Sequence, residues 1–242
     1  MTHWSLPCIC FENSAGRAST PRQLYGISVV LSSQPGLNRS NIQVRAWYAL
    51  FHLCWTVGDE AAAIEQARQA AEIDPLAAYP LAMAAYVQAS FQRYEDTLVS
   101  AKAAVARDPN TYIGQRVLAL GLRWVGDHQN AIAAAERAMQ LSGGHSWAVM
   151  EHANALVSAG RTDEGGKAME SFLARPGERV VPWIFVAVIH AHMDRMDMAY
   201  EALERAFETN DPLLIALRNW PDFHPLREDP RFAEVVQRLG FP

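Results

Sequence analysis

The segment from Val44 to Pro75 reads VRAWYALFHLCWTVGDEAAAIEQARQAAEIDP. Its first half carries large apolar side chains at helical spacing, and its second half carries alanines at helical spacing. Between the two halves stands Gly58-Asp59, where glycine can end one helix in the left-handed conformation and aspartate can cap the next. Pro75 cannot continue the second helix. The segment therefore predicts two short helices joined by a tight turn.

The same pattern returns in steps of 34 residues through four further units. The turn position of Gly58 is followed by Gln92, Gly126, Gly160 and Asp194. The small-residue positions of Ala63 and Ala70 are followed by Thr97, Ala131, Gly165 and Ala199, and by Ala104, Ala138, Phe172 and Ala206. This spacing resembles the tetratricopeptide repeat, whose unit is a helix-turn-helix of 34 residues. The resemblance covers Val44 to about Asp211.

The resemblance implies an all-α fold, a right-handed α-solenoid of about five tetratricopeptide units with a C-terminal capping helix. The predicted helix pairs are 42–57 with 60–73, 77–91 with 94–106, 111–125 with 128–141, 146–159 with 162–174, and 182–193 with 196–209. We expect the turns without glycine, at Gln92 and Asp194, to be locally less stable, and the helix carrying Gly165-Gly166 to be the weakest. The predicted repeat units are 44–77, 78–111, 112–145, 146–179 and 180–211.

Two segments flank the array. Residues 1–19 mix Cys, Pro, Gly and Ser without periodicity and are expected to be poorly ordered. Residues 20–43 are expected to form an N-terminal helix, half of a degenerate repeat that would cover the first unit. Residues 212–242 depart from the period and are expected to cap the array, with Asp229-Pro230 starting a last helix. This tail also resembles the C-terminal arm of bacterial multidomain regulators linked to winged-helix, adenylate-cyclase or kinase modules.

Composition excludes several classes of protein. The net charge of −5 is spread along the chain and argues against a nucleic-acid partner. Three cysteines make no disulfide framework and favour a reducing, cytoplasmic setting. No run of apolar residues is long enough to span a membrane, and the first residues lack a secretory pattern. We therefore expect a cytoplasmic protein with no membrane partner.

Motifs for chemistry are weak. Cys8-x-Cys10 with His3 lacks the paired spacing of a zinc site. The imidazoles of His190-x-His192 would point in different directions from a helix, so a packing role is favoured for His190. There is no nucleophile elbow, phosphate-binding loop or dinucleotide fingerprint. The sequence predicts no catalytic residue, metal or cofactor, and therefore no enzyme.

The face most suited to binding lies on the first helix of each unit, one residue round from the packing positions. In the tetratricopeptide family this face lines the concave groove. Aromatic residues, methionine and arginine, which are enriched at the centres of protein interfaces, predominate on it. The predicted partner-binding residues are Tyr48, His52, Trp55, Tyr79, Tyr86, Arg116, Leu120, Arg123, Trp124, Trp147, Met150, Asn154 and His192.

These residues predict a ligand segment with apolar side chains and carboxylates, held by Arg116 and Arg123. In the alternative, these arginines only stack on neighbouring aromatic rings such as Tyr86 or Trp124. The chain is therefore interpreted as a non-enzymatic scaffold that binds a protein or peptide in its groove, in bacterial signalling or regulation. A second hypothesis is a detached or truncated regulatory arm of a transcription regulator, cyclase or kinase. Self-association through the solenoid ends is possible.

Overall fold

The computed structural model describes residues 42–175 and 181–240, and this part of the chain is helical, with no β-strand. The predicted helix at 20–41 and the segment 1–19 lie outside the described residues. The helices are α2 (Ile42–Trp47), η1 (Tyr48–Val57), α3 (Glu60–Ile73), α4 (Ala78–Ser90), α5 (Tyr94–Arg107), α6 (Tyr112–Trp124), α7 (His128–Leu141), α8 (Ser146–Ser158), α9 (Thr162–Leu173), α10 (Trp183–His192), α11 (Met196–Glu208), η2 (Pro212–Ala216), η3 (Pro221–Phe223), α12 (His224–Arg227) and α13 (Phe232–Leu239).

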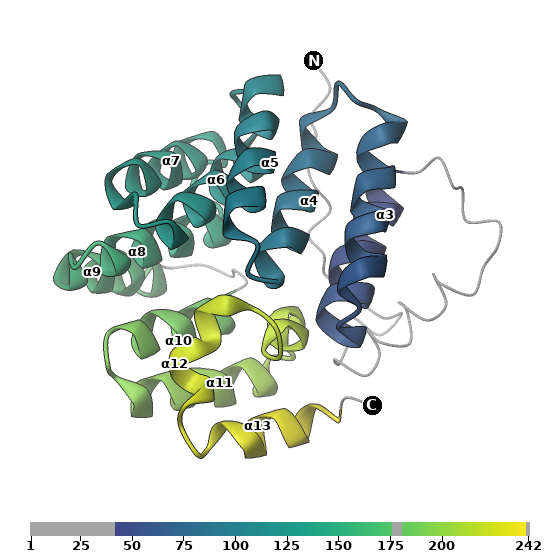
Figure 1. Cartoon of the computed structure of the whole chain (residues 1–242). Helices are drawn as coiled ribbons and strands as arrows, with labels where there is room; N and C mark the ends of the chain where they lie inside the picture. The colour runs from purple at the N-terminus through teal and green to yellow at the C-terminus, as the bar shows by residue number, and fades with distance from the viewer. Residues whose placement is uncertain (1–41, 176–180, 241–242) are drawn as a thin grey trace.

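Consecutive helices pack as antiparallel pairs that stack into an array (Figure 1). The first helix of each unit also contacts the first helix of the next, from η1 through α4, α6 and α8 to α10. These helices form the inner layer of the solenoid, and α3, α5, α7, α9 and α11 form the outer layer. The predicted helix pairs are confirmed, and their bounds agree with the observed ones to within one residue at each end.

The turns follow the predicted chemistry in most units. Gly58, Gly126 and Gly160 have left-handed backbones, with φ of 80°, 81° and 77°. The side chain of Asp59 accepts a hydrogen bond from the backbone N of Ala62 at 3.0 Å, which satisfies one of the free N–H groups at the start of α3. In unit four, α9 begins without such a side-chain cap. Asp163 lies inside the first turn of α9, which begins at Thr162.

The first helix of unit one differs from the expected regular α-helix. After α2 the chain continues as a π-helix over Tyr48–Val57. At its end, the backbone N–H groups of Gly58 and Asp59 both donate to the carbonyl of Leu53, at 2.8 and 2.9 Å. Such widened turns are rare and often occur at functional sites.

Small residues bring the two layers close together. Ala63, Ala70, Ala131 and Ala138 are completely buried where outer helices cross inner ones. Gly165 belongs to this class. A methyl group added there would meet Cγ2 of Val157 at 2.5 Å. From the sequence, Gly165 is expected to lower the stability of α9. In the structure, it allows α9 to lie close to α8.

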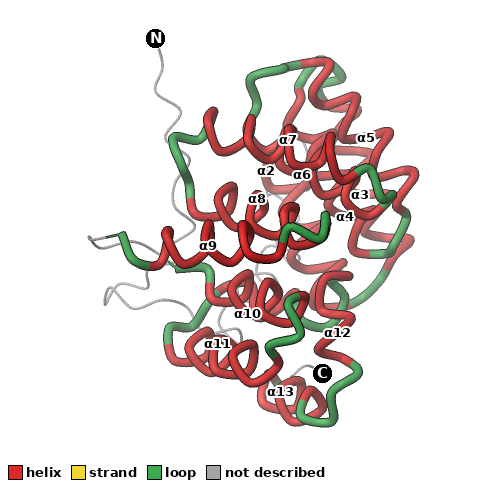
Figure 2. The backbone as a smooth tube through the Cα atoms, turned by 90° about the vertical axis from the view of Figure 1, so that its left-hand side faces the viewer, coloured by secondary structure: helices red, strands yellow, loops and turns green. Residues whose placement is uncertain are grey.

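The tail runs from the end of α11 back towards the start of the array. Figure 2 shows α12 beside α10, and α13 at the end of the molecule near α11. The sequence predicts that Asp229-Pro230 starts the last helix, but α13 begins at Phe232, after Arg231, without a side-chain cap; Asp229 accepts a hydrogen bond from the backbone N of Arg231 in the preceding turn. We expected the tail to seal only the last repeat. It extends further, because Nδ2 of Asn219 donates to the carbonyl of Cys54 in unit one at 2.7 Å.

No helix of residues 42–175 or 181–240 combines the length and apolar character that crossing a bilayer would need.

Candidate functional site

The inner layer of the array, η1, α4, α6, α8 and α10, is here called the groove, and residues Asp211–Arg227 are called the tail segment. The two meet at a buried ion pair. Nη1 and Nη2 of Arg123 on α6 donate to Oδ1 and Oδ2 of Asp222 on η3, at 2.8 and 2.7 Å. Both side chains are almost fully buried, at 3% and 2% exposure. A two-pronged contact of this kind fixes the orientation of the carboxylate as well as its charge.

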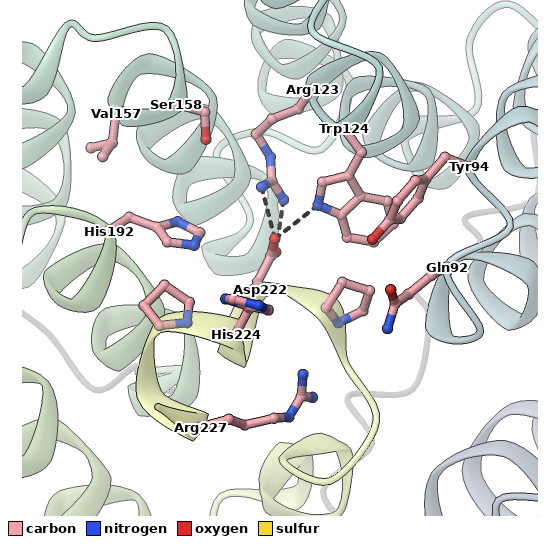
Figure 3. A pocket seen from close by; sticks show the side chains of 12 residues that line it. Gln92, Tyr94, Arg123, Trp124, Val157, Ser158, His192, Asp222, His224 and Arg227 are labelled. Carbon is pink, nitrogen blue, oxygen red and sulfur yellow. Dashed lines mark hydrogen bonds and ion pairs between the residues drawn. The ribbon is translucent and has the colours of Figure 1, made fainter. Parts of the chain in front are cut away.

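Further donors surround the Asp222 carboxylate (Figure 3). Nε1 of Trp124 donates to Oδ1 at 3.0 Å, and Nε1 of Trp220 donates to Oδ2 at 3.2 Å. Nδ2 of Asn154 lies 3.4 Å from Oδ2. The carboxylate is therefore supplied with donors from two units of the array and from its own segment, which offsets the loss of its hydration.

The electrostatics favour the ionised form of Asp222. Burial alone would raise its pKa, but the charge of Arg123 and its hydrogen bonds outweigh burial and hold the pKa at about 2. Glu151, buried on α8, lies 3.4 Å from Nε of Arg123. Its pKa is raised by burial, although Arg123 and Arg116 oppose the shift. One arginine thus lies between two carboxyl groups, and Asp222 has the closer contact.

Trp220 is the second anchor of the tail segment. Its ring lies against three groove aromatics, with centroid distances of 5.8 Å to Trp55, 6.1 Å to Tyr86 and 5.6 Å to Trp124. These rings come from units one, two and three. Aromatic pairs at such distances add stability beyond the area that they bury.

Arg116 and Arg123 have different environments. The guanidinium of Arg116 lies over the rings of Tyr86, Trp147 and Phe185, at 5.1, 5.1 and 5.3 Å. The surroundings of Arg116 therefore match the alternative in which this arginine stacks on neighbouring aromatic rings. Arg123 lies 5.5 Å from the ring of Trp124 and also holds a carboxylate, as the groove hypothesis expects. That carboxylate comes from the same chain.

The other predicted binding residues are spread along the same layer. The ring of Tyr48 stacks on His52 at 5.1 Å. Tyr79 accepts a hydrogen bond from Nε1 of Trp47 at 2.7 Å, and Nδ1 of His192 lies 2.9 Å from Oδ1 of Asn154. Leu120 and Met150 are fully buried. Contact of these residues with a partner stays a prediction. Buried members of the set are His52, Trp55, Tyr86, Arg116, Leu120, Arg123, Met150 and Asn154.

Three residues that fill the groove were not predicted from the sequence. They are Asn219, Trp220 and Asp222, in the run Arg218-Asn219-Trp220-Pro221-Asp222-Phe223. The sequence does contain a signal for them, because aromatic and acidic side chains stand together in this run, outside the 34-residue period. Its chemistry matches the ligand that the groove arginines predict.

A pocket of about 500 Å³ remains at the edge of the groove, beside the ion pair (Figure 3). It is lined by Gln92, Tyr94, Arg123, Trp124, Val157, Ser158, His192, Pro221, Asp222, His224, Pro225 and Arg227.

The side chains that could bind a metal ion are scattered in the part of the chain that the structure describes. Within it, no group of three or more His, Cys, Asp and Glu side chains could hold a metal ion. Cys54 is buried, and burial raises the pKa of its thiol to about 12, so it is a poor nucleophile. The Cys8-x-Cys10 motif lies outside the described residues. His190 is buried in the inner layer, in keeping with the predicted packing role.

Comparisons with known proteins agree with this architecture. A sequence model described as a tetratricopeptide repeat matches residues 44–75. No curated protein matches the chain. Three solved structures are similar in fold. A tetratricopeptide repeat protein from Parabacteroides merdae is 14% identical, with 91% of this chain and 84% of that chain covered and a TM-score of 0.54.

A thermophilic tetratricopeptide repeat protein from Thermus thermophilus is 17% identical, with 90% and 99% covered and a TM-score of 0.53. PilF of Pseudomonas aeruginosa is 16% identical, with 77% and 84% covered and a TM-score of 0.50. The tail's resemblance to regulator arms stays a prediction. The repeat match at residues 44–75, the 34-residue register and the stacked helix pairs together show that the chain contains a tetratricopeptide repeat and has the fold of a tetratricopeptide array.

Proposed function

We propose that the protein is a non-enzymatic interaction scaffold whose groove binds a partner segment carrying an aromatic side chain and, two residues later, a carboxylate. The observation that carries this proposal is the Arg123–Asp222 pair beside the Trp220 cage. Tetratricopeptide proteins in general bind proteins or peptides. The tail segment lies where such a ligand would lie, and a partner segment of the same chemistry would compete with it.

Charge supports this choice of ligand. A buried arginine without a carboxylate is strongly unfavourable, and among the residues that the structure describes the second acidic neighbour of Arg123 is Glu151, at 3.4 Å. A segment that displaced Asp222 would therefore need its own carboxylate at the same place. An apolar or basic segment would leave Arg123 with the single, longer contact to Glu151 and without its two-pronged partner.

Competition with the tail sets the affinity. A tethered ligand acts at an effective concentration in the millimolar range when its linker is short. A free segment with the same contacts would therefore bind the intact protein weakly. Its binding would improve if the tail contacts were weakened or if the partner added contacts outside the groove.

A synthetic peptide with the sequence of Leu217–Pro225 tests the proposal. We expect it to bind a full-length Trp220→Ala/Asp222→Asn variant, in which the tail contacts are weakened, and to bind the parent protein at least about tenfold more weakly. Fluorescence anisotropy of the labelled peptide measures both affinities. A peptide with asparagine in place of its aspartate should lose most of its affinity, because it cannot neutralise Arg123.

The matched control is Arg238→Met, which changes an arginine that pairs with Glu204 outside the groove. It should bind the peptide as weakly as the parent protein does. If the weakened variant is folded by circular dichroism and shows no preference for the aspartate peptide, groove binding of such segments is wrong.

Signalling, a cytoplasmic location and self-association stay predictions. The second hypothesis, a detached regulatory arm, also stays open. An open reading frame that continues upstream of Met1 into a winged-helix, cyclase or kinase pattern would favour it.

A further inference from the structure

Arg227 is the last side chain of the tail segment and faces the pocket at the groove edge (Figure 3). Its Nη2 donates to the carbonyl of Trp220 at 2.6 Å and, more weakly, to that of Leu217 at 3.4 Å. Its Nε is buried with no hydrogen-bond partner. Within residues 42–175 and 181–240, Arg227 takes part in no ion pair.

The charges around the pocket do not balance. Arg123 and Asp222 neutralise each other across 2.7 Å, so the charge of Arg227 is left without a contacting carboxylate. Burial lowers the pKa of Arg227, and Asp222 opposes the shift only from a distance. The other titratable side chains that line the pocket are His192, His224 and Tyr94, and none of them is a carboxylate. A partly buried cation of this kind is most stable with an anion beside it.

The wall of the pocket across from Arg227 is aromatic. The rings of Tyr94 and Trp124 lie 5.2 Å apart and belong to the array, whereas Arg227 belongs to the tail segment. A concave site with an apolar wall and a few convergent polar groups is typical of small-molecule binding. The volume of about 500 Å³ is large enough for a ring with one charged group.

We propose that this pocket binds a small aromatic anion, with its carboxylate or phosphate on Arg227 and its ring against Tyr94 and Trp124. Such a ligand touches the tail segment and the array at the same time. It would therefore hold the tail segment in the groove and oppose its exchange for a partner segment. The binding itself does not depend on the proposed scaffold function.

Isothermal titration calorimetry of the full-length protein tests the site with four probes: benzoate, phenyl phosphate, inorganic phosphate and benzamide. Benzoate and phenyl phosphate separate a carboxylate site from a phosphate site, and benzamide is the uncharged analogue. We expect one of the two aromatic anions to bind with one site per chain. Benzamide and inorganic phosphate should bind at least about tenfold more weakly, since each lacks one half of the recognition.

Two variants locate the ligand. Arg227→Met should weaken binding at least about tenfold through the loss of one charge-assisted contact. Tyr94→Leu keeps the contacts of Arg227 and should also weaken ligand binding. If Arg227→Met does not fold, the affinity of Tyr94→Leu tests the site in its place. Arg238→Met, outside the pocket, should bind like the parent. Binding of benzamide as tight as that of the better aromatic anion, unchanged affinity in folded Arg227→Met or Tyr94→Leu, or no heat with either aromatic anion at millimolar concentration would overturn the proposal.

Discussion

Arg123 and Asp222 are 99 residues apart in the sequence, yet their side chains form a two-pronged ion pair with distances of 2.8 and 2.7 Å in a buried site. The pair joins the middle of the repeat array to the tail. Asn219 and Trp220 extend the contact to the first unit. The concave surface that the repeats create is thus occupied by a segment of the same chain.

Trp220→Ala should destabilise the protein by about 3–5 kcal/mol, the range for removing a buried tryptophan from a packed core. The side chain is buried against rings from three units, so the loss would be felt along the array. Urea unfolding measures the change. Trp220→Phe keeps a ring in the cage and loses the hydrogen bond to Asp222, and it should cost much less. Similar losses for the two variants would contradict a packed cage.

Acid should weaken the contact between tail and array. The pKa of Asp222 in the folded protein is about 2, below the ordinary value of 3.8. The ionised carboxylate therefore stabilises the fold fully above pH 3.8, and this stabilisation is lost as the pH falls from 3.8 towards 2. Unfolding free energies of the parent and of Asp222→Asn, measured between pH 5 and 2, should converge as pH falls. A constant difference between them would show that the pKa of Asp222 is not lowered in the folded protein.

Asp211 should have the opposite dependence on pH. Burial raises its pKa to about 6, despite hydrogen bonds from the backbone of Leu213 and Ile184. Since the folded protein holds this proton more tightly than the unfolded chain, the group adds stability as pH falls from 6 to 4. Asp211→Asn should remove that gain. The slope of unfolding free energy against pH, compared with the parent, checks this, and an unchanged slope between pH 6 and 4 would contradict it.

Gly165→Ala should destabilise the protein by about 1–3 kcal/mol, the usual effect of overpacking a tight contact. The added methyl group would lie 2.7 Å from the carbonyl oxygen of Ala153 and 2.5 Å from Cγ2 of Val157. Gly166→Ala is the matched control, because its methyl group would meet only the flexible end of Met193, at 3.0 Å. Thermal unfolding should rank the control well above Gly165→Ala. The reverse order would show that α8 and α9 are further apart.

Asp194→Gly should stabilise the protein by roughly 1 kcal/mol. The backbone of Asp194 is left-handed, with φ of 57°, and this conformation costs a residue with a side chain about 1 kcal/mol. Asn210→Gly is the control. Its φ is 53°, but asparagine tolerates this conformation, so its gain should be smaller. Urea unfolding compares the two. A loss of stability in Asp194→Gly would mean that its side chain contributes more than its backbone costs.

The repeat array could be predicted from the sequence because its signals are local and periodic. Alanine or another small residue recurs at most of the helix crossings, and glycine at three of the five turns. The role of Gly165 could not be predicted in this way, since a sequence does not give the distance between two helices. Glycine in a helix therefore resembled a weakness until the contact with Val157 was known.

The groove could be predicted in part. The sequence predicts that Arg123 binds a carboxylate of a partner segment, and this stays a prediction; in the structure Arg123 holds the carboxylate of Asp222 in the same chain. The source of that carboxylate could not be predicted, because the period ends before Asp222 and nothing local connects the two residues. Arg116 was expected to act in the same way, but three rings surround it instead. Whether Arg116 lies beside a carboxylate or beside aromatic rings depends on the rotation between successive repeat units.

A double-mutant cycle on Arg123 and Asp222 tests the central claim most directly. The unfolding free energies of Arg123→Met, Asp222→Asn and the double variant are compared with that of the parent by urea titration. We predict that each single change costs about 3–5 kcal/mol and that the double variant costs much less than the sum, with a coupling of about 2–4 kcal/mol. Additive losses, within roughly 0.5 kcal/mol, would show that the tail does not occupy the groove.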